Sequence, residues 1–131
     1  MIYGIGVDLV KVQRIEQAVK RWDRRFLDRI FTPIEQEYCY RQKKPMFHLA
    51  GRFAVKEAVL KALGTGLRLG IRWVEIEVVN SPSGQPTVRV SGKVKELMQQ
   101  NRIETIHVSI SHDTDYSIGQ AVLTASTVKP G

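Results

Sequence analysis

Apolar residues cover most of the circumference of one predicted helix, which begins near Met46 and ends at the glycines after Leu63. Successive residues of a helix lie about 100° apart, and on this projection the polar side chains keep only narrow stripes. A helix this apolar is expected to be buried on most sides. Gly64 and Gly66 follow it, and glycine closes helices because it readily adopts the left-handed conformation. The pattern therefore predicts a buried central helix that ends in a glycine turn.

The polar residues of this helix form two separate stripes. Glu57 and Lys61 lie four residues apart on one stripe, and Arg52 and Lys56 occupy the other. The first pair has two interpretations. It is either a surface ion pair contributing about 0.3–0.5 kcal/mol, or a carboxylate and an ammonium directed at a metal or a phosphate. Helix geometry alone leaves both open.

Strict alternation predicts a strand over Ile2–Val10. One face carries large apolar side chains: Tyr3, Ile5, Val7 and Leu9. The other face carries Ile2, Gly4, Gly6 and Asp8. Asp8 thus projects from a face otherwise rich in glycine, where another backbone or a ligand can come close. It either caps the following helix or serves as a metal ligand on a rigid element.

The rest of the chain alternates between helical and strand patterns. Val12 to about Arg25 reads as an amphipathic helix with an inward stripe formed by Val12, Ile15, Val19, Trp22 and Phe26. Thr32 to Glu35 is a capping box that starts another helix, which ends near Gln42. The later predictions are strands at Ile71–Val79, Thr87–Val90, Thr105–Ser111 and Tyr116–Ala125, and a helix at Lys93–Asn101. This order favours an α+β fold, with a mostly antiparallel sheet against the long central helix.

The composition is that of a globular protein with an acidic partner. The chain has 131 residues, 43% of them hydrophobic, which suits one domain at 1–125 and a flexible tail at 126–131. Cys39 is the single cysteine and is expected to be structural; it excludes an internal disulfide and fits a cytoplasmic protein. No membrane-spanning run or signal peptide is visible. The net charge of +7 indicates nucleic acid, an acidic protein or a polyphosphate as partner.

Basic side chains gather on one face of the predicted helix over Val12 to Arg25. Arg14, Arg21 and Arg25 lie within about 40° of one another on the helical projection. Such a face is either simply solvated or a docking surface for an acidic partner.

Four segments, in this order and at this spacing, carry a family resemblance. They are Gly4–Val10 with Arg14-Ile15, Phe31–Glu35, Arg52–Ala58 through Lys61–Gly66, and Ser109–His112. Together they resemble the bacterial holo-acyl-carrier-protein synthases, which are small 4′-phosphopantetheinyl transferases of fatty-acid synthesis. The chain departs from the usual pattern at Lys11, where an acidic residue is common, and at Gly119, where a slightly larger residue is common.

The resemblance implies a fold, a reaction and a cofactor. The fold would be that of a 4′-phosphopantetheinyl transferase. The reaction moves 4′-phosphopantetheine from coenzyme A to a serine hydroxyl of apo-acyl carrier protein and releases 3′,5′-ADP. Charge on the phosphate oxygens would be neutralised by Mg²⁺, with Mn²⁺ as a possible substitute. The family forms homotrimers with sites between subunits, and neither nucleic acid nor a membrane is implied as a partner.

The resemblance also implies roles for particular residues. Asp8 and Glu57 would bind the metal, and with Lys61 they would be the catalytic residues. Glu57, or a water that it orients, would accept the serine proton. Coenzyme A would contact Lys61, Arg52, His112 and Gly64. Acyl carrier protein would contact Arg14, Arg21 and Arg25.

A second function class is a small basic module that binds nucleic acid through the same arginines. That class predicts a run of exposed aromatic residues for base stacking, whereas the Tyr and Phe residues are scattered along the chain. It also leaves Asp8 and Glu57 without a role.

Overall fold

The structure is a computed structural model, and it describes residues 1–126. Its elements are β1 (Ile2–Lys11), α1 (Val12–Trp22), α2 (Arg24–Ile30), α3 (Pro33–Tyr40), α4 (Pro45–Leu63), the 3₁₀ helix η1 (Trp73–Glu75), β2 (Ile76–Asn80), β3 (Pro86–Val90), α5 (Gly92–Gln100), β4 (Ile103–His112) and β5 (Tyr116–Ala125). No helix in this range is long and apolar enough to cross a membrane. The tail predicted at 126–131 lies outside the described residues except for Ser126, and the single domain over 1–125 stays a prediction.

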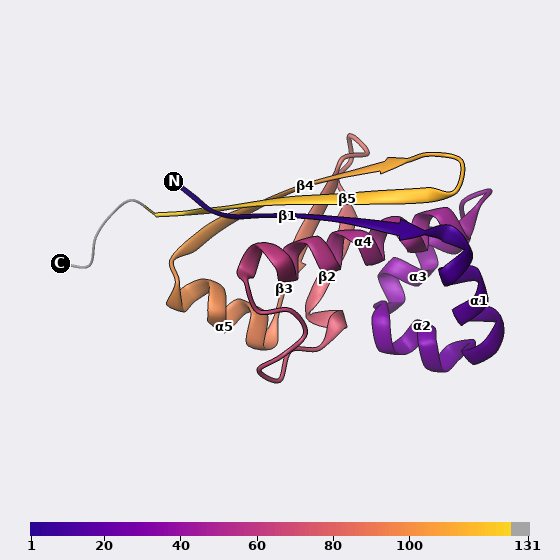
Figure 1. Cartoon of the computed structure of the whole chain (residues 1–131), viewed down its shortest axis with the longest axis horizontal. Helices are drawn as coiled ribbons and strands as arrows, with labels where there is room; N and C mark the ends of the chain where they lie inside the picture. The colour runs from indigo at the N-terminus through magenta and orange to yellow at the C-terminus, as the bar shows by residue number, and fades with distance from the viewer. Residues whose placement is uncertain (127–131) are drawn as a thin grey trace.

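Three strands form an antiparallel sheet in the order β1-β5-β4, and β2 and β3 form a separate antiparallel pair. The central helix α4 runs beneath the three-stranded sheet, and the other helices lie on the same side (Figure 1). The predicted α+β class, with a mostly antiparallel sheet against a long helix, is confirmed.

Glycine residues let the backbone of α4 lie directly on the sheet. A Cβ atom added to Gly6 of β1 would lie 1.9 Å from the carbonyl oxygen of Ala58 on α4. On β5, an added Cβ at Gly119 would lie 2.4 Å from the carbonyl carbon of Ala54. The predicted close approach to the glycine face of β1 is therefore confirmed, and the approaching group is the backbone of α4.

The core surrounds α4, as its apolar pattern predicts. One buried cluster includes Val55, Ala58, Val59, Ile76, Val78, Val94 and Leu123. The other includes Val10, Ile15, Leu27, Phe31, Cys39, Leu49 and Ala54. Burial raises the pKa of Cys39 to about 12, so its thiol stays protonated at neutral pH, as a structural role requires.

The predicted helix from Val12 to about Arg25 begins where expected, but it ends early and a second helix follows it. α1 ends at Trp22 and α2 begins at Arg24. Asp23 lies between them with φ at 45° and ψ at −120°, a conformation rare outside glycine. Val12 and Ile15 are buried as predicted, but Trp22, which was expected to face inward, is 47% exposed.

The predicted strand over Ile71–Val79 is also shorter than expected. η1 occupies its first half, and β2 begins only at Ile76. Glu75 is buried, and its carboxylate accepts hydrogen bonds from the backbone N–H of Arg72 at 3.2 Å and of Val94 at 3.1 Å. These bonds hold the segment in a turn against α5 rather than in an extended strand.

Candidate active site

Asp8 of β1 and Lys61 of α4 form an ion pair beside the central helix. Lys61 Nζ lies 3.0 Å from Asp8 Oδ1 and donates a second bond of 3.0 Å to the carbonyl oxygen of Val7. The surface ion pair between Glu57 and Lys61, considered from the sequence, is not formed among the described residues. Asp8 instead bonds to Lys61 across two elements that are far apart in the chain.

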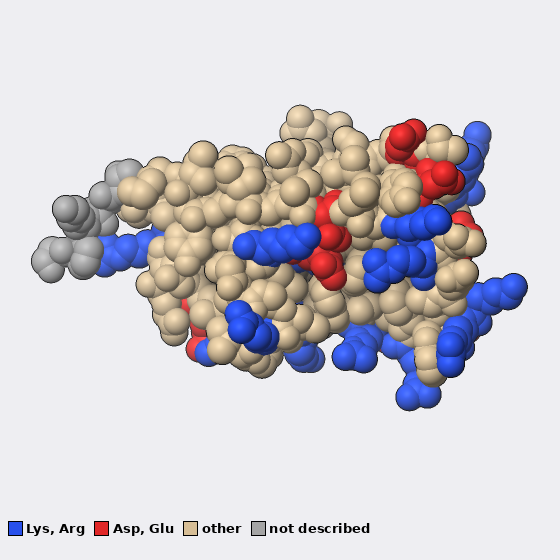
Figure 2. Space-filling view, in the orientation of Figure 1, with Lys and Arg blue, Asp and Glu red and all other residues tan. Residues whose placement is uncertain are grey.

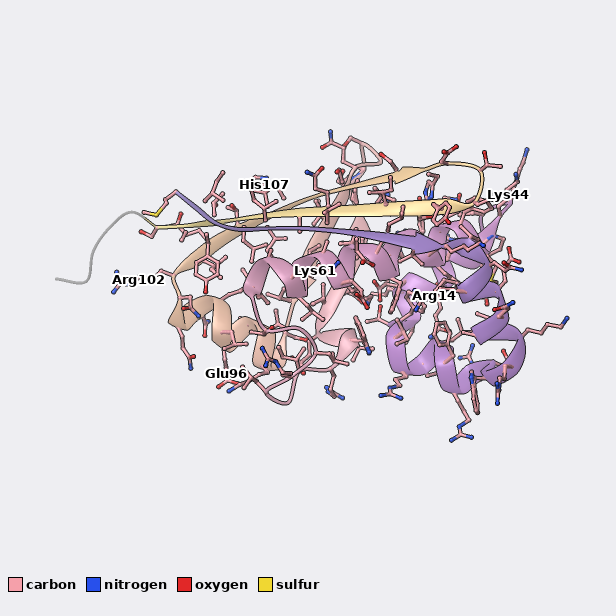
Figure 3. The ribbon with its side chains drawn as sticks, in the orientation of Figure 1. Arg14, Lys44, Lys61, Glu96, Arg102 and His107 are labelled. Atoms are coloured by element: carbon pink, nitrogen blue, oxygen red, sulfur yellow. The ribbon has the colours of Figure 1, made fainter. Side chains whose placement is uncertain are left out.

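Glu57 lies next to this pair on the same side of α4. Burial raises the pKa of Glu57 above its ordinary value of 4.5, and the negative charge of Asp8 raises it further. The positive charges of Lys61 and Arg14 act in the opposite direction with smaller effect. Figure 3 shows Lys61 and Arg14 on the same face of the molecule. Asp8, Glu57 and Lys61, called the carboxylate site below, are thus brought together, as the family resemblance implied.

The carboxylate site fits a divalent cation. Mg²⁺ is bound by a few carboxylates together with water and phosphate oxygens. Burial is the main cause of the raised pKa of Glu57 and the nearby Asp8 carboxylate is the second, and a bound cation would offset both effects. Among residues 1–126, no three His, Cys, Asp or Glu side chains converge on a metal site. Water and substrate oxygens would therefore complete the shell. Figure 2 shows acidic atoms at the middle of this face, with basic groups on either side.

Gly64 ends α4 one turn beyond Lys61. Its φ is 82°, and its N–H donates to the carbonyl oxygens of Leu60 and Lys61. A Cβ atom placed on Gly64 would meet nothing within 4 Å. The helix end therefore leaves open space next to the carboxylate site.

Arg52 lies on the other side of α4 and is almost fully buried. Its Nη2 donates to Asn80 Oδ1, and its guanidinium lies 4.3 Å from the centre of the Tyr38 ring. Its Nε has no hydrogen-bond partner within the described residues. A buried donor without a partner is costly, so Arg52 retains unused capacity to bind an acceptor.

Two histidines lie close to Arg52. The rings of His48 and His112 are 5.8 Å apart, and His112 Nδ1 lies 2.7 Å from Ser117 Oγ. Burial lowers the pKa of both imidazoles. Repulsion from His112 in its protonated form, and then from Arg52, lowers the pKa of His48 further, and repulsion from Arg52 lowers that of His112. Both rings are therefore neutral at pH 7. Arg52, His112, His48, Tyr38 and Asn80 are called the arginine site below.

Three cavities open at the arginine site, and the first, of about 580 Å³, is lined by Arg52, Tyr38 and Asn80 together with Arg41 and Arg89. The second, of about 220 Å³, is lined by all five residues of the site. The third, of about 860 Å³, is lined by His48 and His112, together with Lys43, Lys44 and Phe47. Sequence reasoning had placed Arg52 and His112 at a ligand and had missed Lys44, His48 and Asn80. The sequence offered a signal for Lys44, because it belongs to the basic segment from Arg41 to Lys44 that directly precedes α4. Asn80 had none, because its role depends on Arg52, which is distant in sequence.

The central helix separates the two sites. α4 packs on β1 through Ala58 and on β5 through Ala54. At its N-terminal half it packs on β4, where an added Cβ at Gly51 would lie 3.1 Å from His112 Cε1. α4 thus crosses the sheet diagonally. The carboxylate site lies on the β1 side of the helix and the arginine site on the β4 side. Within one chain, the two sites are therefore not adjacent.

The break at Asp23 leaves Arg14 and Arg21 on α1 and places Arg25 on α2. Arg14 stays near Glu57, whereas Arg21 and Arg25 gather around Trp22, with their guanidinium carbons 4.8 Å and 5.8 Å from its ring centre. A cavity of about 440 Å³ adjoins Trp22 and Arg25. Figure 2 shows basic side chains crowded over the end of the molecule formed by α1 and α2.

An apolar surface covers the side of the sheet that faces away from α4. No helix of the described residues lies over it (Figure 1). Its side chains are large and between 37% and 60% exposed: Tyr3, Ile5, Val7, Leu9, Tyr116 and Ile118. Contiguous exposed apolar patches of this kind mark protein interaction surfaces.

Comparison with known proteins gives one consistent family. Residues 4–121 match the 4′-phosphopantetheinyl transferase superfamily. The holo-[acyl-carrier-protein] synthase of Syntrophus aciditrophicus is 45% identical over 112 residues, which are 86% of this chain and 88% of that protein. The crystal structure of the Neisseria meningitidis holo-[acyl-carrier-protein] synthase is similar, with a TM-score of 0.87 at 33% identity, over 95% of this chain and 99% of the other. The Helicobacter pylori enzyme, solved in complex with coenzyme A, has a TM-score of 0.81 at 37% identity, covering 92% and 99%. The chain belongs to the 4′-phosphopantetheinyl transferase superfamily.

Proposed function

We propose that this protein is a holo-[acyl-carrier-protein] synthase. It transfers 4′-phosphopantetheine from coenzyme A to a serine hydroxyl of apo-acyl carrier protein. The observation that carries the proposal is the convergence of Asp8, Glu57 and Lys61 beside α4 in a chain of this family. Membership in this family favours the transferase over the nucleic-acid-binding alternative.

The carboxylate site supplies the groups that this reaction needs. Asp8 and Glu57 would hold Mg²⁺, or Mn²⁺ in its place, and the bound ion would neutralise charge on the phosphate oxygens. Lys61 places an ammonium group on the same oxygens. The serine oxygen forms a bond to the phosphorus of the phosphopantetheine, the bond from that phosphorus to the ADP oxygen breaks, and Glu57 or a water that it orients accepts the serine proton.

The arginine site would bind the nucleotide end of coenzyme A. Arg52 and the neutral His112 line the 220 Å³ cavity, and phosphate oxygens are acceptors that suit a guanidinium. Gly64 leaves room at the carboxylate site for the rest of the molecule.

The α1–α2 end of the molecule would bind the acyl carrier protein. Arg14, Arg21 and Arg25 give this end a positive field that attracts an acidic partner. Arg14 lies near Glu57, so a partner docked there brings its serine toward the carboxylate site.

The active site would be completed by a second subunit in a homotrimer. α4 keeps the carboxylate and arginine sites apart within one chain, and the apolar face of the sheet offers a surface for self-association. A neighbouring copy could then bring its arginine site to this carboxylate site. The cytoplasmic location stays a prediction.

The direct test is transfer to a purified apo-acyl carrier protein. We expect its mass to increase by one phosphopantetheine group, with equimolar release of 3′,5′-ADP, in the presence of coenzyme A and Mg²⁺. A chelator and the Asp8→Ala variant should each abolish the increase. If the carrier protein has its acceptor serine intact and still gains no mass with the wild-type protein, the proposed activity is refuted.

A further inference from the structure

Lys56 is a buried ammonium group that the proposed reaction does not use. It is fully buried, and its Nζ donates to Glu35 Oε1 at 2.7 Å, to the carbonyl oxygen of Ile76 at 2.7 Å and to that of Trp73 at 3.3 Å. These bonds use all three donors of the ammonium. Desolvation by burial lowers the pKa of Lys56, while the charge of Glu35 and its hydrogen bond raise it.

Glu35, at the start of α3, is equally buried. Its Oε1 also accepts a bond of 2.9 Å from the backbone N–H of Thr32, and its Oε2 accepts one of 2.8 Å from the backbone N–H of Val78. The ion pair of Lys56 and Glu35 therefore joins α3, the middle of α4 and β2.

The same ion pair occupies the free edge of β2. Within residues 1–126, β2 has a strand neighbour on one side only, which is β3. On its other side, the carbonyl of Ile76 bonds to Lys56 and the N–H of Val78 bonds to Glu35. These are groups that a neighbouring strand would otherwise pair. The two side chains thus replace a strand and fix the register of β2 along α4.

Asn80 continues this contact between α4 and β2. Arg52 precedes Lys56 by one helical turn, and Asn80 follows Val78 by two residues, so their side chains lie on matching faces. The result is the hydrogen bond from Arg52 Nη2 to Asn80 Oδ1. A slip of β2 by one residue would turn the Asn80 side chain to the opposite face and leave Arg52 without it.

We infer that Lys56 and Glu35 are positioning residues for the nucleotide end of coenzyme A. Their ion pair fixes the register of β2 against α4, and that register places Asn80 on Arg52 at the 220 Å³ cavity. Neither Lys56 nor Glu35 lines this cavity, so both act through Arg52 and Asn80. The inference rests on the proposed function, in which Arg52 contacts coenzyme A.

The product 3′,5′-ADP is the probe, because calorimetry measures its binding without turnover. Lys56→Met alone leaves Glu35 buried and unpaired, which can prevent folding. The main variant therefore combines Lys56→Met with Glu35→Gln, which removes both charges and keeps an acceptor for Val78. We expect a folded protein that binds 3′,5′-ADP about tenfold more weakly, the scale of one lost hydrogen bond to a charged group. KM for coenzyme A should rise similarly, and KM for acyl carrier protein should not change.

Glu75→Gln is the matched control, because Glu75 is another buried carboxylate that accepts backbone hydrogen bonds. Its partners are Arg72 and Val94 rather than Val78, so we expect a loss of stability with unchanged 3′,5′-ADP binding. A folded double variant that binds 3′,5′-ADP as tightly as the wild type would overturn the inference.

Asn80→Ala provides an independent second test. If the ion pair acts through Asn80, adding Lys56→Met and Glu35→Gln to the Asn80→Ala variant should weaken 3′,5′-ADP binding little further. Additive losses would overturn the inference while leaving the coenzyme A site in place. A wild type that does not bind 3′,5′-ADP would overturn the proposed site itself, and the inference with it.

Discussion

At Glu57, burial and the neighbouring Asp8 both favour the protonated carboxyl group, so the pKa is raised above 4.5. The folded protein therefore binds this proton more tightly than the unfolded chain does. The resulting stability is fully present below pH 4.5 and is lost as the pH rises through the folded-state pKa. In metal-free buffer, Glu57→Gln should thus raise the unfolding temperature at neutral pH and change it little near pH 4, as measured by calorimetry.

Adding Mg²⁺ at neutral pH should raise the unfolding temperature of the wild type above that of Glu57→Gln. A ligand stabilises the folded state that binds it, so the wild type should gain stability from Mg²⁺ while Glu57→Gln gains little. Glu96→Gln, on the exposed side of α5 (Figure 3), is the control and should respond to Mg²⁺ as the wild type does. Equal gains in Glu57→Gln and the wild type would contradict metal binding by Glu57.

For Lys61, a catalytic role can be distinguished from a purely structural one by measuring turnover and stability on the same variant. Lys61→Met keeps the apolar stem and the helix propensity, so the fold should survive. We expect the single-turnover rate to fall by about 10²-fold, the scale seen when one electrostatic stabiliser is removed, with a smaller change in coenzyme A affinity. If Lys61 only pairs with Asp8, the same protein should turn over normally and lose less than about 1 kcal/mol of stability.

The sequence indicated the residues of the carboxylate site but not their partners. The family resemblance placed Asp8 and Glu57 in one site, and their positions on a glycine face and on an apolar helix, where a charge has no structural need, agreed with it. The bond between Lys61 and Asp8 was not predictable, because it depends on how closely α4 approaches β1. The buried pair of Lys56 and Glu35 was missed for the same reason, since its members come from different helices.

At the scale of elements, Arg21 of α1 and Arg25 of α2 lie together around Trp22, at the corner between the two helices. Arg14 lies near Glu57, so charge reversal there would disturb the carboxylate site as well as docking. Arg21→Glu with Arg25→Glu avoids this and should raise KM for acyl carrier protein by about tenfold, the effect of reversing two exposed charges. KM for coenzyme A should stay unchanged, and carrier affinity of the wild type should fall with rising salt.

Lys93→Glu with Lys95→Glu, on α5, makes the same change of net charge away from this corner. It should leave KM for the carrier close to that of the wild type. Equal effects of the two double variants would mean that net charge, rather than the α1–α2 corner, attracts the carrier.

Regular periodicity predicted the elements well, and tertiary contacts explain the exceptions. The amphipathic pattern continues through Asp23, yet the chain turns there and lets Leu27 and Ile30 reach the core. Likewise, alternation continues through Glu75, yet its buried carboxylate bonds two backbone amides and holds a 3₁₀ turn. Neither contact leaves a local signal in the sequence.

On the scale of the whole molecule, the exposed apolar face and the two separated sites have one common explanation. A buried interface would cover Ile5, Val7 and Leu9, which a monomer leaves in water. Assembly through this face could also join the carboxylate site of one copy to the arginine site of the next. The sequence could not show this, because an apolar strand face predicts burial without indicating whether the covering surface comes from the same chain or from another copy.

Mixing two inactive variants tests this assembly directly. Glu57→Ala removes the carboxylate site and Arg52→Gln removes the arginine site, so each variant alone should be inactive. If every site combines residues of two subunits, equal mixing by co-expression leaves about a quarter of the sites with both residues intact. Activity should return to that level, as measured by transfer to the carrier. Adding Val7→Glu to both chains places a charge on the apolar face and should abolish the recovery. If both sites serve the same chain instead, no mixture contains an intact site and no activity returns.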